Sequence, residues 1–252
     1  MSKVVIVTGG SGGLGAEIGL RFGLAGAKVV INDIDYLDDA EAVAKKINEI
    51  GAEAFVHKAD VCNYEQVKGM VEATLSRWDR IDVLVNNAGG MHRWLGKTGQ
   101  LVTEMKEEVW RKIIDLNVTS PFICIKAVAP QMIKQGEGHI INVSSGLAVS
   151  GGKGFSPYSA AKAGMIALSK SAARELGDYN IKVNTVWPQP TTTDRVVKED
   201  KLSKETVNEF VRQSLLHRTG GSAQEFAEFI VHLSGMENVT GQLFALDSRI
   251  LF

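Results

Sequence analysis

Cysteine is scarce in this chain, and its two cysteines, Cys62 and Cys124, are isolated. Two isolated cysteines support neither a disulfide framework nor a zinc site, so we expect no bound metal. Apolar residues are also few at the start of the chain, where only Val4 to Val7 precede Thr8 and Gly9. Such a run is too short for the apolar region of a signal peptide, and we expect a cytoplasmic protein.

An excess of either charge is lacking too, since 28 lysines and arginines stand against 29 aspartates and glutamates, for a net charge of −1. With no basic block, the chain is not expected to bind nucleic acid. No apolar run approaches the length that crosses a bilayer, so we expect no membrane partner. The sequence shows no linker, internal repeat or low-complexity segment. We therefore expect residues 1–252 to form a single domain, in keeping with 44% hydrophobic and 23% charged residues.

Short apolar runs alternate with helical patterns along the chain. Strands are predicted at Val4–Val7, Lys28–Asp33, Ala54–His57, Asp82–Val85, His139–Val143, Ile181–Val186 and Gln242–Leu246. Helices are predicted from about Ala16 to Phe22 and at Tyr36–Ile50, Tyr64–Arg77, Lys106–Lys134, Tyr158–Leu176 and Ala223–Leu233, the fourth interrupted at Pro121 and Pro130. This alternation predicts a doubly wound, Rossmann-like α/β fold of about seven parallel strands with helices on both faces. Ligands of such a fold bind at the carboxyl ends of its strands.

A glycine cluster lies between the first strand and the first helix. The pattern Thr8-Gly9-x-x-x-Gly13-x-Gly15 permits a tight turn and lets a phosphate approach the N–H groups at a helix N-terminus. A flexible turn is the alternative for the cluster alone. We interpret it as a nucleotide-binding loop, with the predicted contacts Gly9, Ser11, Gly13, Leu14 and Gly15.

Asp33 ends the second strand, where its carboxylate can accept hydrogen bonds from the adenosine ribose and repel a 2′-phosphate. No lysine or arginine in the glycine loop or directly after Asp33 is placed to bind such a phosphate, which favours NAD over NADP. Asp35 is better described as the cap of the next helix. Asn86 suits loop bracing and cofactor contact equally. Further predicted cofactor contacts follow the third and fourth strands: Asp60, Val61, Asn87, Ala88 and Gly89.

Tyr158 and Lys162 lie four residues apart at the start of an alanine-rich helix. Residues at this spacing share a helix face, so the phenol and the ammonium can point into the same space. A nearby positive charge lowers the pKa of a phenol from its usual value of about 10. The phenol is therefore a candidate base, although a solvated lysine beside a partly buried tyrosine explains the pair taken alone.

These motifs, together with Asn117 and Ser145, occur in an order and approximate spacing that resemble the short-chain dehydrogenase/reductase family. The resemblance runs from about Lys3 to Leu246. The resemblance implies that Tyr158 is the general acid/base, taking the hydroxyl proton of an alcohol as hydride leaves for the nicotinamide. Lys162 would lower the tyrosine pKa and hold the nicotinamide ribose. Ser145 would hydrogen-bond the substrate oxygen, and Asn117 would hold a water that relays protons to Lys162. A homotetramer is the family default.

Two segments depart from the family pattern. Gln189 stands where the family usually has the glycine of Pro-Gly, so we expect a changed local geometry there. Asp247 is followed by Ser248 and Arg249 where the family usually has two glycines. Residues 188–216 match the family's substrate lid in position. Within it the predicted cofactor contacts are Pro188, Thr191 and Thr193.

The loop over residues 90–103 is longer than the usual family version and is expected beside the active site. Its Arg93 is interpreted as a surface residue, with binding of an acidic group as the alternative. The expected function is that of an NAD(H)-dependent oxidoreductase that interconverts a small-molecule secondary alcohol and ketone. An NADP-dependent carbonyl reductase, another reaction on the same scaffold and a catalytically silent dinucleotide-sensing protein are the alternatives. Asp33 opposes the first of these, and the intact set of Ser145, Tyr158 and Lys162 opposes the last.

Overall fold

The computed structural model describes residues 2–96, 99–190, 209, 212–216 and 221–249. Within them, seven parallel strands form one sheet in the order β3-β2-β1-β4-β5-β6-β7. Their bounds are β1 Val4–Thr8, β2 Lys28–Asp33, β3 Glu53–Lys58, β4 Val83–Asn86, β5 Gly138–Val143, β6 Ile181–Pro188 and β7 Leu243–Leu246. The doubly wound α/β fold is therefore confirmed, and each strand lies within two residues of its predicted bounds.

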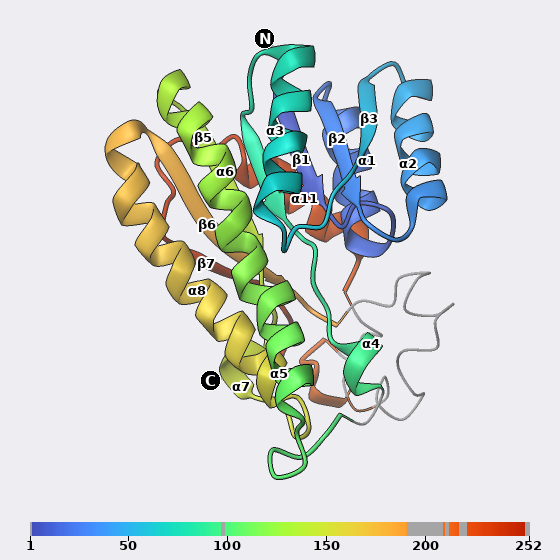
Figure 1. Ribbon diagram of the computed structural model, residues 1–252, viewed down its shortest axis with the longest axis vertical. Coiled ribbons are helices and arrows are strands. Elements are labelled where there is room, and N and C mark those ends of the chain that lie inside the picture. Colours follow the sequence, from blue (N-terminus) through green and yellow to red (C-terminus); the bar gives the residue numbers. More distant parts are fainter. Residues whose placement is uncertain (1, 97–98, 191–208, 210–211, 217–220, 250–252) are drawn as a thin grey trace.

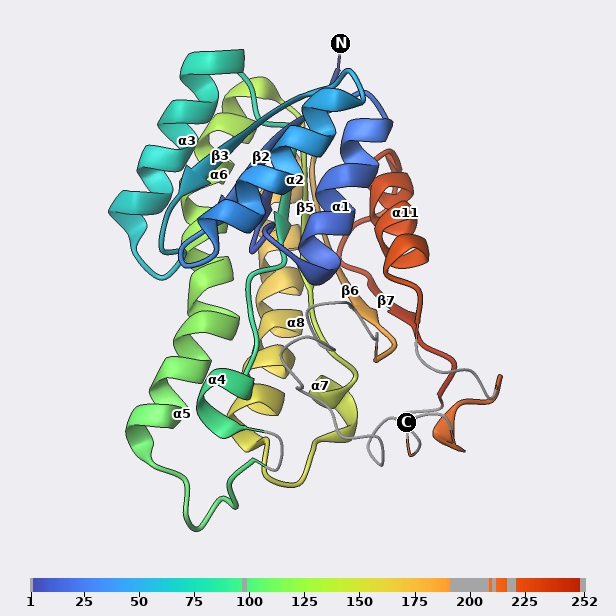
Figure 2. The same ribbon diagram turned by 90° about the vertical axis from the view of Figure 1, so that its right-hand side faces the viewer.

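Helices cover both faces of this sheet (Figure 1, Figure 2). One face carries α1 (Gly13–Leu24), α2 (Leu37–Glu49) and α11 (Ala223–Leu233). The other carries α3 (Tyr64–Trp78), α6 (Ser120–Gln135) and α8 (Ser156–Leu176). Two single-turn helices, α4 (His92–Leu95) and α7 (Leu147–Ser150), lie in segments predicted as loops, and a 3₁₀ turn, η2 (Gly177–Tyr179), follows α8.

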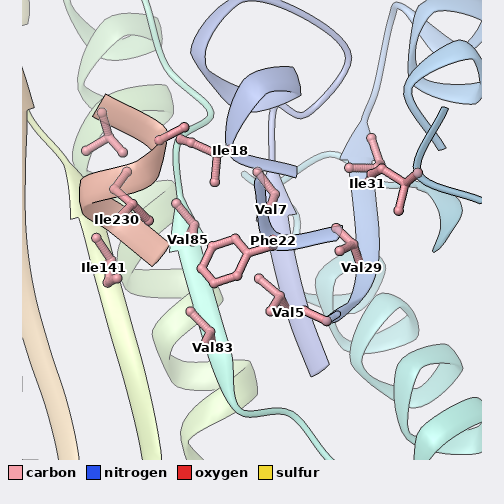
Figure 3. Packing of buried hydrophobic residues seen from close by; sticks show 14 of the residues in the cluster. Val5, Val7, Ile18, Phe22, Val29, Ile31, Val83, Val85, Ile141 and Ile230 are labelled. Atoms are coloured by element: carbon pink, nitrogen blue, oxygen red, sulfur yellow. The ribbon is translucent and has the colours of Figure 1, made fainter. Parts of the chain in front are cut away.

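The core follows from the alternation of side chains along the strands. Val5 and Val7 of β1 point to the α1 side of the sheet, whereas Ile6 points to the α3 side. Phe22 of α1 is 1% exposed and lies among the valines of β1 and β4 (Figure 3). Burying a side chain of this size contributes roughly 1.5–3 kcal/mol. Because both faces are covered, the central strands are apolar at successive positions.

The helical region from Glu107 to Gln135 continues through both predicted interruptions. Pro130 lies inside α6, so the predicted break there is wrong; burial of the α6 face around Val128 and Met132 offsets the local cost of the proline. Pro121 lies in the first turn of α6, where a missing N–H is tolerated. The irregularity is instead a π turn, η1 (Asp115–Thr119), which joins α5 (Glu107–Ile114) to α6.

The same helical region corrects the expectation that no segment has the length and apolar character to cross a bilayer. It runs for 29 residues and contains a window with a mean hydropathy of 1.3. Its apolar side, which includes Cys124, Val128 and Met132, packs into the core on the α3 side of the sheet. Core helices share the length and composition of membrane spans, and this packing is the reason we interpret the segment as a core helix.

Candidate active site

The glycine loop between β1 and α1 packs against the loop that follows β4. Gly9 has a φ of +63°, and a Cβ atom at this position would lie 2.9 Å from the Cα atom of Ala88. A Cβ atom on Gly15 would overlap the carbonyl oxygen of Gly9 and come within 2.5 Å of the Asn87 side-chain nitrogen. Glycine is therefore required at both positions. Gly9 is required for its positive φ and for the close packing, and Gly15 for the close packing alone.

Thr8 and Asn87 hold these two loops together. The Thr8 hydroxyl accepts hydrogen bonds from the N–H groups of Asn87 and Ala88, both at 3.1 Å, and donates to the Val85 carbonyl at 3.3 Å. Asn87 Nδ2 donates to the carbonyl oxygens of Thr8 and Gly9, each at 3.0 Å. Asn87, predicted as a cofactor contact, thus braces the glycine loop. Thr8 begins the glycine-cluster pattern in the sequence, but only the structure shows that its hydroxyl joins the two loops.

The N-terminus of α1 suits an anionic ligand. Its N-cap residue, Gly12, has no side chain to accept a hydrogen bond, and its first turn contains no acidic residue. The first N–H groups of the helix therefore lack a side-chain cap, and the helix dipole favours negative charge beside them. These features, in the loop that also holds Ser11 and Leu14, fit the diphosphate of a dinucleotide.

Asp33 lies at the carboxyl end of β2 and is 8% exposed. Its Oδ2 accepts a hydrogen bond from the Ser11 hydroxyl at 2.5 Å, which ties β2 to the glycine loop. Its Oδ1 accepts from the N–H groups of residues 34–36, at 2.8, 3.2 and 3.3 Å. A carboxylate at the first position of a turn can reach the N–H groups that follow it. Asp33 therefore presents its charge where the expected ribose would lie, held by neighbours on both sides.

The expectation that Asp35 caps α2 is wrong, because the N-cap residue of α2 is Tyr36 and the helix has no side-chain cap; the N–H groups that the Asp33 carboxylate binds lie in the turn before it. The Asp35 carboxylate instead forms an ion pair with Arg93 of α4, with Nη1 and Oδ2 2.7 Å apart. Arg93 was interpreted as a surface residue, and its side chain is indeed 72% exposed. The pair nevertheless links the long loop after β4 to the turn after β2, next to Asp33.

Tyr158 and Lys162 share a face of α8, as their spacing predicts. The Lys162 Nζ lies 5.7 Å from the centre of the Tyr158 ring and donates to the carbonyl oxygen of Val143 at 2.8 Å. Lys162 is 3% exposed, and its own carbonyl accepts a hydrogen bond from the Ser144 hydroxyl at 3.1 Å. A Cβ atom on Gly89 would lie 3.2 Å from Nζ, so the loop after β4 reaches this lysine.

The pKa values of this pair differ from the expectation that Lys162 lowers the pKa of Tyr158. Burial raises the pKa of Tyr158 to about 12, and the hydrogen bond with the Ser145 side chain acts in the opposite direction. Part of the phenol side chain remains exposed, but its surroundings still disfavour the phenolate. Burial also lowers the pKa of Lys162 to about 7. Burial disfavours the charged form of each group, which raises the pKa of the phenol and lowers that of the amine.

Asn117 lies in the π turn η1 and is fully buried. Its Nδ2 donates to the carbonyl oxygens of Gly90 and Ile113, at 2.8 and 2.9 Å, and its Oδ1 accepts from the Gly90 N–H at 3.0 Å. The side chain therefore fixes the start of the loop after β4. A Cβ atom on Gly89 would lie 2.8 Å from Oδ1, which places Asn117 on the same side of that glycine as Lys162.

A buried amide chain supports the strand ends beneath the site. Asn86 Nδ2 donates to Asn142 Oδ1 at 2.7 Å, and Asn142 Nδ2 donates to the Ser169 hydroxyl at 2.8 Å. Of the two roles that suited Asn86, bracing is the one these contacts show. Asn142 and Ser169 were not predicted from the sequence as site residues. The sequence signal for Asn142 was a polar residue inside an apolar run predicted as a strand; the structure then makes it the register partner of Asn86.

The other predicted cofactor contacts in the described residues follow β3 or end β6. Asp60 follows β3, and its carboxylate accepts from the Cys62 N–H at 2.8 Å, while Val61 is 6% exposed. Pro188 is the last residue of β6. Thr191 and Thr193 lie outside the described residues, as do most of residues 188–216, predicted as the substrate lid.

A cavity of about 500 Å³ lies elsewhere on the described surface, and none of the predicted site residues lines it; its lining is Val102, Met105, Glu107, Trp110 and Arg111. The candidate site is therefore the group around Tyr158 and Lys162, and not this cavity.

Comparison with known proteins agrees with the geometry. A family model described as short chain dehydrogenase matches residues 3–204. A 3-oxoacyl-[acyl-carrier-protein] reductase of Synechocystis sp. is 37% identical over 253 residues, covering 99% of this chain and 97% of the relative. The 3-oxoacyl-[acyl-carrier-protein] reductases FabG of Staphylococcus aureus and Staphylococcus epidermidis are each 37% identical over 244 residues. Those matches cover 96% of this chain and 95% and 96% of the two relatives.

Proposed function

The chain belongs to the short-chain dehydrogenase family of oxidoreductases, and within that family we propose that it interconverts a secondary alcohol and a ketone with NAD(H). The observation that carries the proposal is the grouping of Ser145, Tyr158 and Lys162 at the carboxyl end of β5, joined through Gly89 to the loop that packs on the glycine loop. This grouping provides a hydroxyl, a phenol and an amine that can pass a proton among them.

In the proposed mechanism, Tyr158 gives a proton to the ketone oxygen during reduction and takes it back during oxidation. Ser145, which already hydrogen-bonds the phenol, donates a hydrogen bond to the same substrate oxygen and stabilises its developing charge. A dinucleotide held by the glycine loop and Asp33 would supply or accept the hydride at its nicotinamide. Lys162, with a pKa of about 7, can exchange a proton with the phenol at neutral pH and hold the nicotinamide ribose.

Asn117 keeps its predicted role as part of this proposal, ordering a water that connects Lys162 to solvent. The support is positional, since both side chains would contact a Cβ atom on Gly89. The hydrogen bonds of Asn117 to Gly90 and Ile113 give its amide one fixed orientation.

The choice of NAD rests on Asp33. Its carboxylate would accept hydrogen bonds from a ribose hydroxyl and repel a phosphate at the same place. Arg93, which α4 brings to this turn, has its charge balanced by Asp35, and Lys58 is the neighbour of Asp33 in the register of β2 and β3. An NADP-dependent carbonyl reductase is the competing assignment, and it would require a 2′-phosphate to displace this ion pair.

For the substrate, 3-oxoacyl thioesters form the first class to test, because the relatives that cover nearly the whole chain are named as reductases of 3-oxoacyl groups on acyl-carrier protein. Simple ketones and secondary alcohols form the second class.

We also propose that the protein assembles as a homotetramer. The support is a set of exposed apolar side chains on α5 and α6, since Trp110, Phe122 and Ile133 are 37%, 48% and 37% exposed. Light scattering of the purified protein tests this, with a mass near four chains expected and a monomer contradicting it. Replacing Phe122 with a charged residue should dissociate the assembly if this surface is the interface.

The proposed function is tested by titrating the purified protein with NADH and with NADPH. A screen of 3-oxoacyl thioesters, ketones and secondary alcohols then follows nicotinamide absorbance. Tighter NADH binding with turnover supports the proposal. Tighter NADPH binding would show that Asp33 has been misinterpreted, and NADH binding without turnover on any compound would favour the catalytically silent alternative.

A further inference from the structure

The two segments that depart from the family pattern meet in the structure. Gln189, directly after β6, is 8% exposed, and Ser248 comes shortly after β7. Gln189 Oε1 accepts hydrogen bonds from the N–H and the hydroxyl of Ser248, at 3.3 and 2.8 Å. The glycines usual at these positions in the family have no side chains that could make this contact. The pairing is therefore a property of this chain's own residues.

A third segment joins the pair through Ser214. Because the Ser248 hydroxyl donates its proton to Gln189, the 2.6 Å contact between the Ser214 and Ser248 hydroxyls requires Ser214 to be the donor. The Ser248 carbonyl also accepts from the Leu215 N–H at 2.8 Å. We call these contacts among Gln189, Ser248, Ser214 and Leu215 the Gln189 tether.

The residues on either side of Ser248 hold it in place. Asp247 and Arg249 form a bidentate ion pair, with Nη2 and Oδ2 2.6 Å apart and Nε and Oδ1 2.9 Å apart. Their side chains are 1% and 9% exposed. A buried bidentate pair between residues two apart leaves the residue between them little conformational freedom. Ser248 is thus constrained by its neighbours in the chain, and its own N–H and hydroxyl are held by Gln189.

The tether reaches the edge of the proposed active site. β6 pairs with β5, and the N–H of Ser144, next to the proposed catalytic Ser145, donates to the Val186 carbonyl of β6 at 2.8 Å. The Gln189 N–H donates to the Leu246 carbonyl of β7 at 2.7 Å. Pro188, a predicted cofactor contact, lies between these two anchor points. A displacement of Gln189 would therefore shift Pro188, next to the expected position of the nicotinamide.

We propose that Gln189 is a positioning residue: through Ser248 it holds the loop after β6 to residues 214–215 and so sets the affinity of the site for the dinucleotide. The cofactor part of this inference rests on the proposed function. The tether part rests only on the hydrogen bonds described above. Removing the Gln189 acceptor takes two partly buried hydrogen bonds from Ser248, a change that corresponds to about a tenfold loss in an equilibrium constant.

Two measurements on the full-length chain test the inference: hydrogen exchange of the Leu215 and Ser248 amides, and the Kd for NADH. The variants are Gln189→Leu, Ser248→Ala, the double variant and Ser248→Thr, which keeps the hydroxyl. Gln242→Leu is the matched control, since Gln242 is an exposed glutamine just before β7 with no contact to the tether. Thermal unfolding establishes whether each variant is folded. If Gln189→Leu is not folded, Ser248→Ala alone tests the tether.

We expect Gln189→Leu and Ser248→Ala each to speed exchange at Leu215 and to raise the Kd for NADH about tenfold. The double variant should lose less than the sum of the two single variants, because both single variants remove the hydrogen bond from the Ser248 hydroxyl to Gln189 Oε1. Ser248→Thr and Gln242→Leu should resemble the wild type.

Unchanged exchange at Leu215 in Gln189→Leu would overturn the tether. Faster exchange with an unchanged Kd would overturn the positioning role. Absence of NADH binding by the wild-type protein would reject the proposed function and with it the cofactor part, whereas the exchange rates would still decide the tether.

Discussion

Acid should destabilise this protein through His139, a buried histidine of β5 that is 3% exposed. The Asn184 side chain fixes its protonation state. Asn184 Oδ1 accepts from the Gln242 N–H at 3.0 Å, so Nδ2 is the atom that faces His139 Nε2 at 2.9 Å. The Val239 carbonyl takes the other proton of Nδ2 at 2.7 Å. His139 Nε2 must therefore be the unprotonated acceptor.

Protonating His139 would break this hydrogen bond and bury a charge near Lys182 and Lys3. Burial, followed by the repulsion from these two lysines, lowers the pKa of His139 from 6.5 to about 4. The unfolded chain consequently binds more protons than the folded chain between these values. This contribution to stability is complete above pH 6.5 and is lost as the pH falls toward 4, to a total of about 3 kcal/mol.

Urea unfolding of the wild type and of His139→Gln between pH 4.5 and pH 7.5 would measure this effect. Glutamine does not titrate and offers an acceptor to Asn184 at a similar reach. Carboxylates contribute equally to both proteins, so the difference in unfolding free energy between them should shrink by about 2 kcal/mol as the pH falls from 7 to 5. An exposed control, Gln224→Ala on α11, should follow the wild type. Parallel pH curves for wild type and His139→Gln would refute the reasoning.

Three further predictions concern the site. Tyr158→Phe should reduce turnover by about a thousandfold or more, since the proton donor is lost, while the Kd for NADH from fluorescence titration changes less than about threefold; retained turnover would remove Tyr158 from the mechanism. Asp33→Ala should weaken NADH binding about tenfold and reduce the ratio of the Kd for NADPH to the Kd for NADH, because a charge that repels a 2′-phosphate is removed. An unaltered ratio in the paired titration would mean that another residue binds the adenosine ribose. Arg93→Ala should lower the unfolding free energy by less than about 1 kcal/mol, since its ion pair with Asp35 is solvent-exposed, and a larger loss in urea unfolding would assign Arg93 a packing role.

Several features of the site were predictable from the sequence because they depend on local spacing. The i, i+4 relation brought Tyr158 and Lys162 to one face of α8, and Gly9 and Gly15 marked the turn that only glycine can form. The strand ends were predictable as well, since an apolar run that stops at a polar residue marks the edge of a parallel sheet. Asp33 was found in this way.

Other features depended on contacts between segments far apart in the chain. The partner of Asp35 was decided by the arrival of Arg93 from α4, and α2 has no side-chain cap. The continuation of α6 through Pro130 was decided by burial of its apolar face. The sequence identified Gln189 and Ser248 as separate departures from the family pattern, and only the structure placed them in contact.

What the sequence by itself determined was the fold class and the chemical groups of the site, because side-chain periodicity and motif spacing are written along the chain. What only the tertiary structure decided was the environment of those groups. Proximity to Lys162 predicted a lowered pKa for Tyr158, whereas burial raises it and lowers that of Lys162 instead. Desolvation is set by every segment that packs around a group, and no local pattern of residues records that sum.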